Sequence, residues 1–181
     1  MSDDYIVEQL KDIYKDNVQW LSFAELKNGA LLTLTTVILG LLNDVIGDSN
    51  IKYIFLFFCM IIIAICIFSY YPYLNKVVHK RNILYRVIKK SYEKTGKNAF
   101  ESMNIIFYVC VFLSEKELYM KAVRKVLGLD KKYLFTCLEE NYIDQIMAIS
   151  NISCIKYYMF KIAISLFAIM ALLMLVGILI A

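Results

Sequence analysis

Clustered lysines and arginines are the side chains of this sequence that are best suited to bind a ligand. Between Asn75 and Lys161 the chain carries 16 basic and 8 acidic residues, a surplus of eight positive charges. Such a surplus attracts anions, among them nucleotides, oligonucleotides and acidic lipid headgroups. The candidate ligand-binding residues form two clusters, Lys121, Arg124 and Lys125, and Arg86, Lys89 and Lys90.

A second interpretation of the same charges needs no specific ligand. Loops on the cytoplasmic side of a membrane protein carry an excess of lysine and arginine for reasons of topology alone. A third cluster, Lys76, Lys80 and Arg81, directly follows an apolar segment and is expected to touch lipid headgroups. The sequence leaves both interpretations open for the other two clusters.

Enzymatic chemistry is not expected of this chain. The sequence has one histidine, His79, and we find no nucleophile elbow, P-loop, dinucleotide-binding glycine pattern or HExxH motif in it. Carboxylates cluster at Glu139, Glu140 and Asp144, but lysines lie nearby, which is typical of a solvated helix face. The five cysteines show no CxxC spacing, which is typical of small buried residues in a reducing compartment. We therefore predict no catalytic residue, no metal site and no cofactor.

Small and polar residues form a stripe along the apolar segment that begins at Gly29. Spacings of four and three place them on one helix face, and the members are Gly29, Thr33, Thr36, Gly40 and Asn43. Lipid does not favour such a face, so the stripe should contact protein or water. One interpretation is helix packing, with glycines for close approach and threonines bonded to the backbone. The other is that several copies of the chain turn the stripe inward and line a conducting path.

Two charged residues, Glu25 and Lys27, lie where this segment would enter a membrane. They are candidates for a gate at the mouth of a pore, for an intersubunit ion pair, or for simple interfacial anchors. Because one chain with three spans cannot enclose a pore by itself, conduction requires a homo-oligomer.

Three apolar stretches are predicted to cross a bilayer, at about residues 29–46, 54–71 and 157–181. The first is apolar over only fourteen residues and reaches eighteen if Asn43 and Asp44 lie at the far interface. A helix of twenty residues spans roughly 30 Å, the thickness of the hydrocarbon core. The chain is 60% hydrophobic, far above the usage of soluble domains. We therefore predict a mostly α-helical membrane protein, in which residues 29–74 form a transmembrane hairpin and residues 157–181 a third transmembrane helix.

The distribution of basic residues predicts the orientation of these spans. Of the 20 lysines and arginines, 16 lie between Asn75 and Lys161, whereas the loop between the first two spans has only Lys52. The segment between spans two and three should therefore be cytoplasmic. The N-terminus is then cytoplasmic as well, and the C-terminus lies outside.

Two cytoplasmic parts follow from this topology. Residues 1–28 are predicted to form an amphipathic helix that continues into the first span, and its apolar face holds Val7, Leu10, Tyr14, Val18 and Leu21. Residues 75–156 are predicted to form a small basic domain. This domain is either α or α+β, because residues 104–113 fit both a strand and a short buried helix.

Local signals predict where the helices of the cytoplasmic domain begin and end. Ser114, with Glu117 three residues later, predicts a capping box, and Gly128 predicts the end of the helix that follows. Asp130 is expected to cap the last helix, which would continue from Lys131 into the third span without a break.

Several segments make the chain resemble the transmembrane effector family of the bacterial Pycsar anti-phage system. Residues 24–32 (AELKNGALL) are similar to the family's Ala-Asp-x-Lys-Ala-like entry into its first span, with Glu25 in place of the aspartate and two extra residues before the alanine. The second span ends near Pro72, as it does in the family. Further similar residues are Asn104, Ile105, Ile106 and Phe107, then Leu113, Ser114, Glu115 and Glu117, and finally Ile146, Ile149, Ser150, Lys156 and Tyr157. The chain departs from the family pattern after Phe107, where Tyr108 and Val109 replace an expected glycine.

This resemblance implies an effector of the bacterial inner membrane that is controlled by a nucleotide. Related small membrane effectors respond to cyclic nucleotides, cyclic oligonucleotides or linear oligonucleotides, so the identity of the ligand does not transfer. The implied partner is a nucleotide-synthesising enzyme, either a nucleotidyltransferase or a cyclase.

The expected function is an oligomeric ion channel that the nucleotide opens or holds closed, and whose activity depolarises the cell and leads to growth arrest or death. The alternatives are a non-conducting membrane anchor or adaptor that recruits a cytosolic partner, and a holin-like toxin that disrupts the membrane directly.

Overall fold

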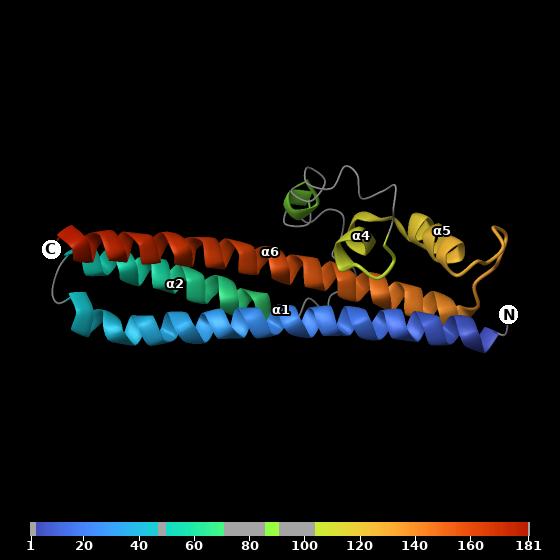
Figure 1. The fold of residues 1–181 in the computed structure, drawn as a ribbon, viewed down its shortest axis with the longest axis horizontal. Coiled ribbons are helices and arrows are strands. Elements are labelled where there is room, and N and C mark those ends of the chain that lie inside the picture. Colours follow the sequence, from blue (N-terminus) through green and yellow to red (C-terminus); the bar gives the residue numbers. More distant parts are fainter. Residues whose placement is uncertain (1–2, 47–49, 71–85, 91–103, 181) are drawn as a thin grey trace. The chain divides into compact units, whose positions relative to one another are not determined.

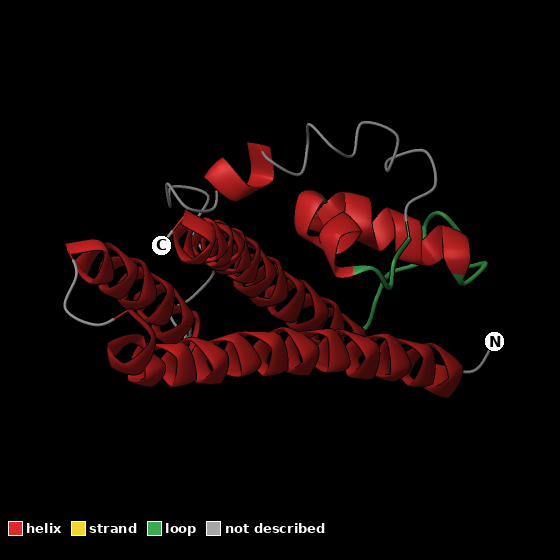
Figure 2. Cartoon of the chain, turned by 60° about the vertical axis from the view of Figure 1, so that its left-hand side comes forward, coloured by secondary structure: helices red, strands yellow, loops and turns green. Residues whose placement is uncertain are grey.

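Long helices dominate the computed structural model, which describes residues 3–46, 50–70, 86–90 and 104–180. The helices are α1 (Asp3–Ile46), α2 (Asn50–Tyr70), α4 (Tyr108–Leu113), α5 (Lys116–Val126) and α6 (Cys137–Ile180), and residues 86–90 are also helical (Figure 1). No described residue belongs to a strand (Figure 2). The predicted mostly α fold is thus confirmed, and residues 108–113 form a short helix.

The chain divides into two compact units. The first, which we call the head unit, contains residues 1–23 and 73–155. The second, which we call the apolar unit, contains residues 24–72 and 156–181. Helices α1 and α6, each of 44 residues, contribute residues to both units. The predicted continuity of the N-terminal helix into residues 29–46 is confirmed.

A hydrophobic core holds the head unit together. It joins the first turns of α1 to α5, α6 and the segment around α4, and its buried members include Ile6, Leu10, Ile13, Tyr119, Val123, Ile143 and Ile146. The predicted apolar face of residues 1–28 was wrong by one position along most of its length. The structure buries Ile6, Leu10 and Ile13, whereas the predicted Val7 and Tyr14 are half-buried at the edge of that face. Apolar residues occur at helical spacing in two adjacent rows along this helix, one through Ile6, Leu10 and Ile13 and one through Val7 and Tyr14. Because both rows have the same period, periodicity alone did not decide which row faces the core.

Helix α5 ends at a glycine, as its sequence predicts. Gly128 has a φ of +66°, a conformation that favours glycine. The backbone N–H of Leu129 donates to the carbonyl of Arg124 at 2.8 Å, and the N–H of Gly128 donates to the carbonyl of Lys125 at 3.4 Å. This pair of bonds is a Schellman motif.

The predicted helix starts were wrong in both cases. Helix α5 begins after Glu115 with no side-chain cap, because the hydroxyl of Ser114 donates instead to the carbonyl of Val111. Helix α6 is capped at Thr136 rather than at Asp130. The backbone N–H of Thr136 donates to the Glu139 carboxylate at 2.6 Å, and the N–H of Glu139 donates to the Thr136 hydroxyl at 3.4 Å. This reciprocal pair is a capping box.

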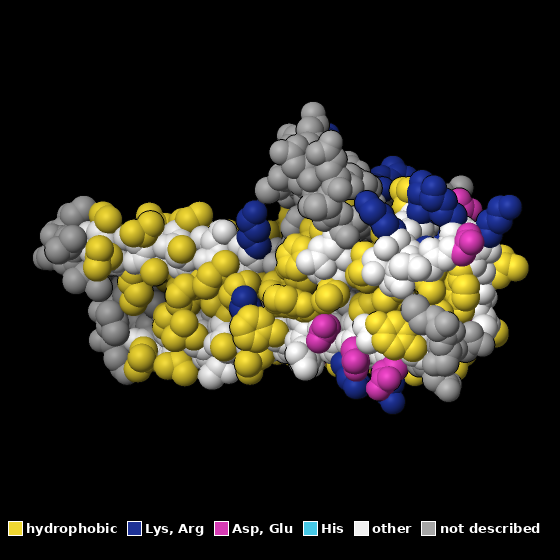
Figure 3. Space-filling view, turned by 45° about the vertical axis from the view of Figure 1, so that its right-hand side comes forward, with side chains coloured by type: hydrophobic (Ala, Val, Ile, Leu, Met, Phe, Trp, Pro, Cys, Tyr) yellow, Lys and Arg dark blue, Asp and Glu magenta, His cyan; other side chains and the backbone are white. Residues whose placement is uncertain are grey.

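The apolar unit is built from the later part of α1, from α2 and from the later part of α6. Its core is formed by Leu31, Phe55, Cys59, Ile62, Cys66, Ala163 and Met170. Large apolar side chains also cover its outer surface (left in Figure 3), among them Leu34, Phe57, Phe68 and Leu172. A unit that is hydrophobic both inside and outside is suited to lipid.

Two described helices are long and apolar enough to cross a bilayer, at Lys52–Tyr70 and within Cys137–Val176. They overlap the predicted second and third spans. The predicted first span, residues 29–46, lies in α1, but the side chains of its last five residues are outside the described part of the structure, and this span remains a prediction.

Candidate functional site

The basic cluster on α5 consists of two exposed lysines, Lys121 and Lys125, and of Arg124, whose contacts are structural. Lys121 and Lys125 are exposed and lie one helical turn apart, so they share a face. The Nε atom of Arg124 donates to the carbonyl of Tyr133 at 3.0 Å, and its guanidinium lies 4.9 Å from the centre of the Phe135 ring. Arg124 therefore holds the connection between α5 and α6, and the two lysines are the better candidates for an anion.

The second basic cluster lies on the helical residues 86–90 of the head unit. Arg86 and Lys90 are exposed, and Lys89 is half-buried. The cluster of Lys76, Lys80 and Arg81 lies outside the described residues.

In the apolar unit, an ion pair between a buried lysine and a half-buried glutamate joins α1 to α6. The Nζ atom of Lys156 lies 2.6 Å from the Oε1 atom of Glu25, and the lysine side chain is only 6% exposed, against 44% for the glutamate. The Tyr70 hydroxyl of α2 donates to the backbone carbonyl of Glu25 at 2.7 Å. The Lys156 ammonium also lies 5.6 Å from the centre of the Tyr70 ring. We call this meeting of Glu25, Tyr70 and Lys156 the three-helix junction.

Two neighbours complete the junction. A Cβ atom added to Gly29 would lie 2.6 Å from the Tyr70 hydroxyl, so any larger residue would displace that hydroxyl. Asn28 is fully buried, and its Nδ2 atom donates to the carbonyls of Ala24 at 2.9 Å and Lys156 at 3.4 Å. Glu25 thus pairs within its own chain in this structure. Lys27, the second candidate for a gate or an interface, has its Nζ atom 5.3 Å from the ring centre of Tyr157.

The small-and-polar stripe on α1 lies mostly at the surface of the apolar unit. Thr33, Thr36 and Gly40 are exposed, whereas Gly29 is half-buried against Tyr70. The threonine hydroxyls donate to backbone carbonyls one turn earlier, at 3.1 Å for Thr33 and 2.8 Å for Thr36. Asn43 lies in α1, but its side chain is outside the described part of the structure. Within one chain, the stripe is therefore not the face that α1 buries.

The head unit contains a buried polar contact that the sequence did not reveal. Asn17 is fully buried, and its Oδ1 atom accepts a hydrogen bond from the Ser150 hydroxyl of α6 at 2.7 Å. Its Nδ2 atom donates to the carbonyl of Ile13 at 2.9 Å and to that of Ile106 at 3.4 Å. Asn17 thus links α1 by hydrogen bonds to both α6 and the segment before α4.

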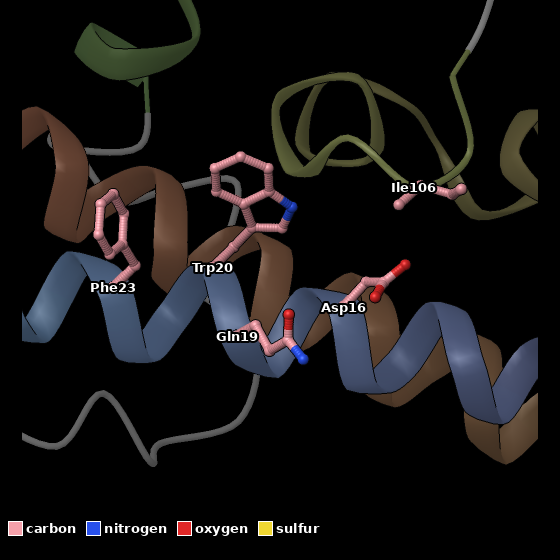
Figure 4. Close-up of a pocket in the computed structure, with 5 residues that line it drawn as sticks. All are labelled: Asp16, Gln19, Trp20, Phe23 and Ile106. Atoms are coloured by element: carbon pink, nitrogen blue, oxygen red, sulfur yellow. The ribbon is translucent and has the colours of Figure 1, made fainter.

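Beside this contact, the head unit has an open cavity of about 430 Å³, which we call the Trp20 pocket (Figure 4). It is lined by Asp16, Gln19, Trp20 and Phe23 of α1 and by Ile106. The Trp20 ring is supported by two aromatic rings, with centroid distances of 6.1 Å to Phe107 and 5.6 Å to Tyr108.

A family comparison decides the identity of the chain. A family model described as the Pycsar effector protein domain matches residues 9–181. The chain belongs to the Pycsar effector family. No curated protein and no solved structure matched it significantly.

Membership of the Pycsar effector family confirms the resemblance seen in the sequence. It implies a transmembrane effector of cyclic-nucleotide anti-phage signalling, with a partner cyclase as the source of the nucleotide. Together with the two apolar helices, it indicates a membrane protein. The family is one of membrane effectors rather than known enzymes.

Within the described residues, no group of three or more histidine, cysteine, aspartate or glutamate side chains is arranged to hold a metal ion.

Sequence reasoning missed the partners of this Pycsar effector's charged residues. Glu25 was singled out as a gate or interface candidate and Lys156 only as part of the family resemblance, and their pairing with each other and with Tyr70 was not predicted, because it depends on how three separate helices pack. One signal was available: Lys156 interrupts an otherwise uncharged stretch, and a charge in such a place usually has a partner.

Proposed function

We propose that this Pycsar effector is an oligomeric ion channel of the bacterial inner membrane whose state is set by a cyclic nucleotide. Nucleotide made by the partner cyclase during infection changes the balance between closed and open assemblies. The open assembly dissipates the membrane potential and stops growth. A ligand can shift this balance only through its different affinities for the two states, so it either opens the channel or holds it closed.

The proposed topology has three spans, at about residues 29–46, 54–71 and 157–181. Residues 1–28 and the basic domain 75–156 are cytoplasmic, and the C-terminus is outside. The charge distribution supports this orientation, because 16 of 20 basic residues lie between Asn75 and Lys161. The hydrophobic surface of the apolar unit supports the placement in lipid.

The observation that carries the proposal is that α1 and α6 each supply residues to both units. Each helix is one uninterrupted element of 44 residues, or about 66 Å. A change that ligand binding causes in the head unit therefore has a covalent and helical route into the apolar unit. The Glu25–Lys156 ion pair lies within two residues of the point where both helices pass from one unit to the other.

The exposed stripe of α1 is the proposed lining of the pore. Thr33, Thr36 and Gly40 face away from the core of their own chain, and the threonine hydroxyls are satisfied by backbone carbonyls. In an oligomer these residues can face neighbouring copies or a water-filled path without burying an unpaired polar group. Lys121 and Lys125, with Arg86 and Lys90, are the proposed contacts for the nucleotide phosphate.

Expression in bacteria with a membrane-potential dye, with and without the cyclase, tests this function. We expect depolarisation to depend on the nucleotide, and Lys121→Glu with Lys125→Glu should abolish the response while leaving membrane insertion intact. A potential that never changes would refute the channel and favour an adaptor. Leakage of large dyes instead of ionic current would favour a holin-like toxin.

A matched pair of variants tests the stripe. Thr36→Asp places a charge on the proposed pore face, whereas Leu34→Asp places one about two residues away, on a different face of the same helix. We expect Thr36→Asp to insert and to change the current, and Leu34→Asp to impair insertion because its carboxylate would face lipid. Equal insertion defects in both variants would contradict the pore assignment.

A further inference from the structure

We infer that the Trp20 pocket binds the base of the nucleotide, an inference that rests on the proposed function. The pocket combines an aromatic surface with two polar side chains, and nucleobases are recognised by this combination. Its volume of about 430 Å³ lies within the range of roughly 300–1,000 Å³ that is usual for small-molecule sites. All five lining residues belong to the head unit.

The aromatic surface is formed by Trp20 and Phe23. Their side chains are 36% and 48% exposed, large fractions for aromatic residues in a folded unit. Ring contacts with Phe107 and Tyr108 restrict the rotation of the Trp20 indole. A rigid indole with an accessible remainder is a stacking surface for a planar base, and stacking tolerates every base because each has a π face.

The polar edge is formed by Asp16 and Gln19. These residues lie one helical turn from Trp20 and Phe23 respectively, so all four share one patch of α1 (Figure 4). The Asp16 carboxylate accepts hydrogen bonds, as from an amino or imino group of a base. The Gln19 amide can donate to a neighbouring ring nitrogen or carbonyl. Together they offer an acceptor and a donor, the two kinds of group that the pairing edge of a base requires.

The charge of the Trp20 pocket suits the base of a nucleotide and not its phosphate. None of its five described lining residues is basic, and Asp16 is negative. A phosphate would be repelled here, whereas the uncharged base would not. The pocket is therefore assigned to the base alone, and the phosphate is expected to contact basic side chains outside it.

The pocket is also directly connected to the packing of the head unit. Asn17 follows Asp16 in the chain and bonds both to the carbonyl of Ile106, which lines the pocket, and to Ser150 of α6. A base that moves Ile106 relative to α1 would strain this buried contact. Binding at the Trp20 pocket can thereby change how α1 and α6 pack within the head unit.

Fluorescence offers a direct test because Trp20 is the only tryptophan of the chain. The full-length protein in lipid nanodiscs is titrated with the cyclic nucleotides of the four bases and with a cyclic ribose phosphate that lacks a base. We expect one or more nucleotides to quench the indole emission, and the base-free compound to leave it unchanged. Quenching by brominated lipids with no nucleotide effect would overturn the inference and make Trp20 an interfacial anchor.

Variants measured by equilibrium dialysis with labelled nucleotide complete the test. Trp20→Leu should weaken binding by roughly 5- to 150-fold, the loss of one base–aromatic stack, and Trp20→Phe should retain part of the affinity. Asp16→Asn should reduce the preference among bases more than the affinity. The matched controls Tyr5→Leu and Asp12→Asn, on the same helix but outside the pocket, should change neither.

The binding measurements distinguish a failure of the pocket assignment from a failure of the proposed function. If the wild-type protein binds nucleotide and the Trp20 and Asp16 variants keep its affinity and base preference, the pocket assignment is wrong and the nucleotide-controlled channel stands. If the wild-type protein binds no cyclic nucleotide, both fail. Circular dichroism and gel filtration identify any variant that has not folded, and Trp20→Phe serves in place of a misfolded Trp20→Leu.

Discussion

Removing Glu25 or Lys156 from their ion pair should affect the stability of the protein to different extents. The lysine side chain is 6% exposed and the glutamate 44% exposed, with Nζ and Oε1 2.6 Å apart. Glu25→Gln leaves a buried ammonium group without its counter-charge. Lys156→Met removes the buried charge and leaves a carboxylate that is nearly half exposed. The first change should therefore destabilise the protein much more than the second.

The magnitudes follow from the burial of each group. Breaking a fully buried pair by removing one partner costs about 3–5 kcal/mol. Here the glutamate is 44% exposed and the glutamine amide oxygen retains part of the contact, so we expect about 2–3 kcal/mol for Glu25→Gln. A partly exposed carboxylate regains hydration, so Lys156→Met should cost about 1 kcal/mol or less. In a chain of this size, 1 kcal/mol corresponds to about 2–4 °C in Tm.

The assay is the midpoint of heat-induced loss of the folded species in detergent, followed by gel filtration. The double variant Glu25→Gln with Lys156→Met should be close to Lys156→Met alone, because the unpaired charge is gone. The exposed Asp12–Lys15 pair provides the control, since its separation of 2.8 Å is similar but both side chains are more than half exposed. Asp12→Asn should change Tm by at most about 1 °C. Equal losses for Glu25→Gln and Lys156→Met, or a larger loss for the lysine variant, would refute the reasoning.

Three further predictions concern packing and pH. Gly29→Ala should change stability by less than about 1 kcal/mol, because displacement of the Tyr70 hydroxyl from its hydrogen bond offsets the better helix propensity of alanine, and in a Tyr70→Phe background the same change should raise Tm by about 1–4 °C. Ser150→Ala should cost about 1–3 kcal/mol in chemical denaturation because it leaves the buried Oδ1 atom of Asn17 without its donor, and an unchanged denaturation midpoint would contradict this. Burial raises the pKa of the Tyr119 hydroxyl, so the fold favours the neutral phenol. Stability should therefore be constant below the ordinary tyrosine pKa of about 10 and fall as the pH rises above it, and Tyr119→Phe should make this fall shallower.

The sequence was a good guide where local interactions decide the structure. Uninterrupted helical propensity predicted the continuity of α1 through Gly29, and the flexibility of glycine predicted the end of α5 at Gly128. The capping box also lies within four residues, but Thr136 and Glu139 were overlooked in favour of Asp130.

The sequence was a poor guide where separate helices meet. Which stripe of α1 is buried depends on its neighbours, so Ile6 and Ile13 replaced the predicted Val7 and Tyr14 in the core. The partners of Glu25 and Asn17 lie more than 130 residues away along the chain, at Lys156 and Ser150. Such contacts leave no local pattern. The Trp20 pocket was missed for the same reason, because Ile106 reaches it from another segment.

Electrical recording from purified protein in planar bilayers, with cyclic nucleotide added to the proposed cytoplasmic side, tests the proposed channel most directly. We expect an ion current whose amplitude rises or falls when the nucleotide is added, and no such change with the Lys121→Glu and Lys125→Glu double variant. A bilayer that contains the folded protein and carries no current with or without any cyclic nucleotide would contradict the proposed channel.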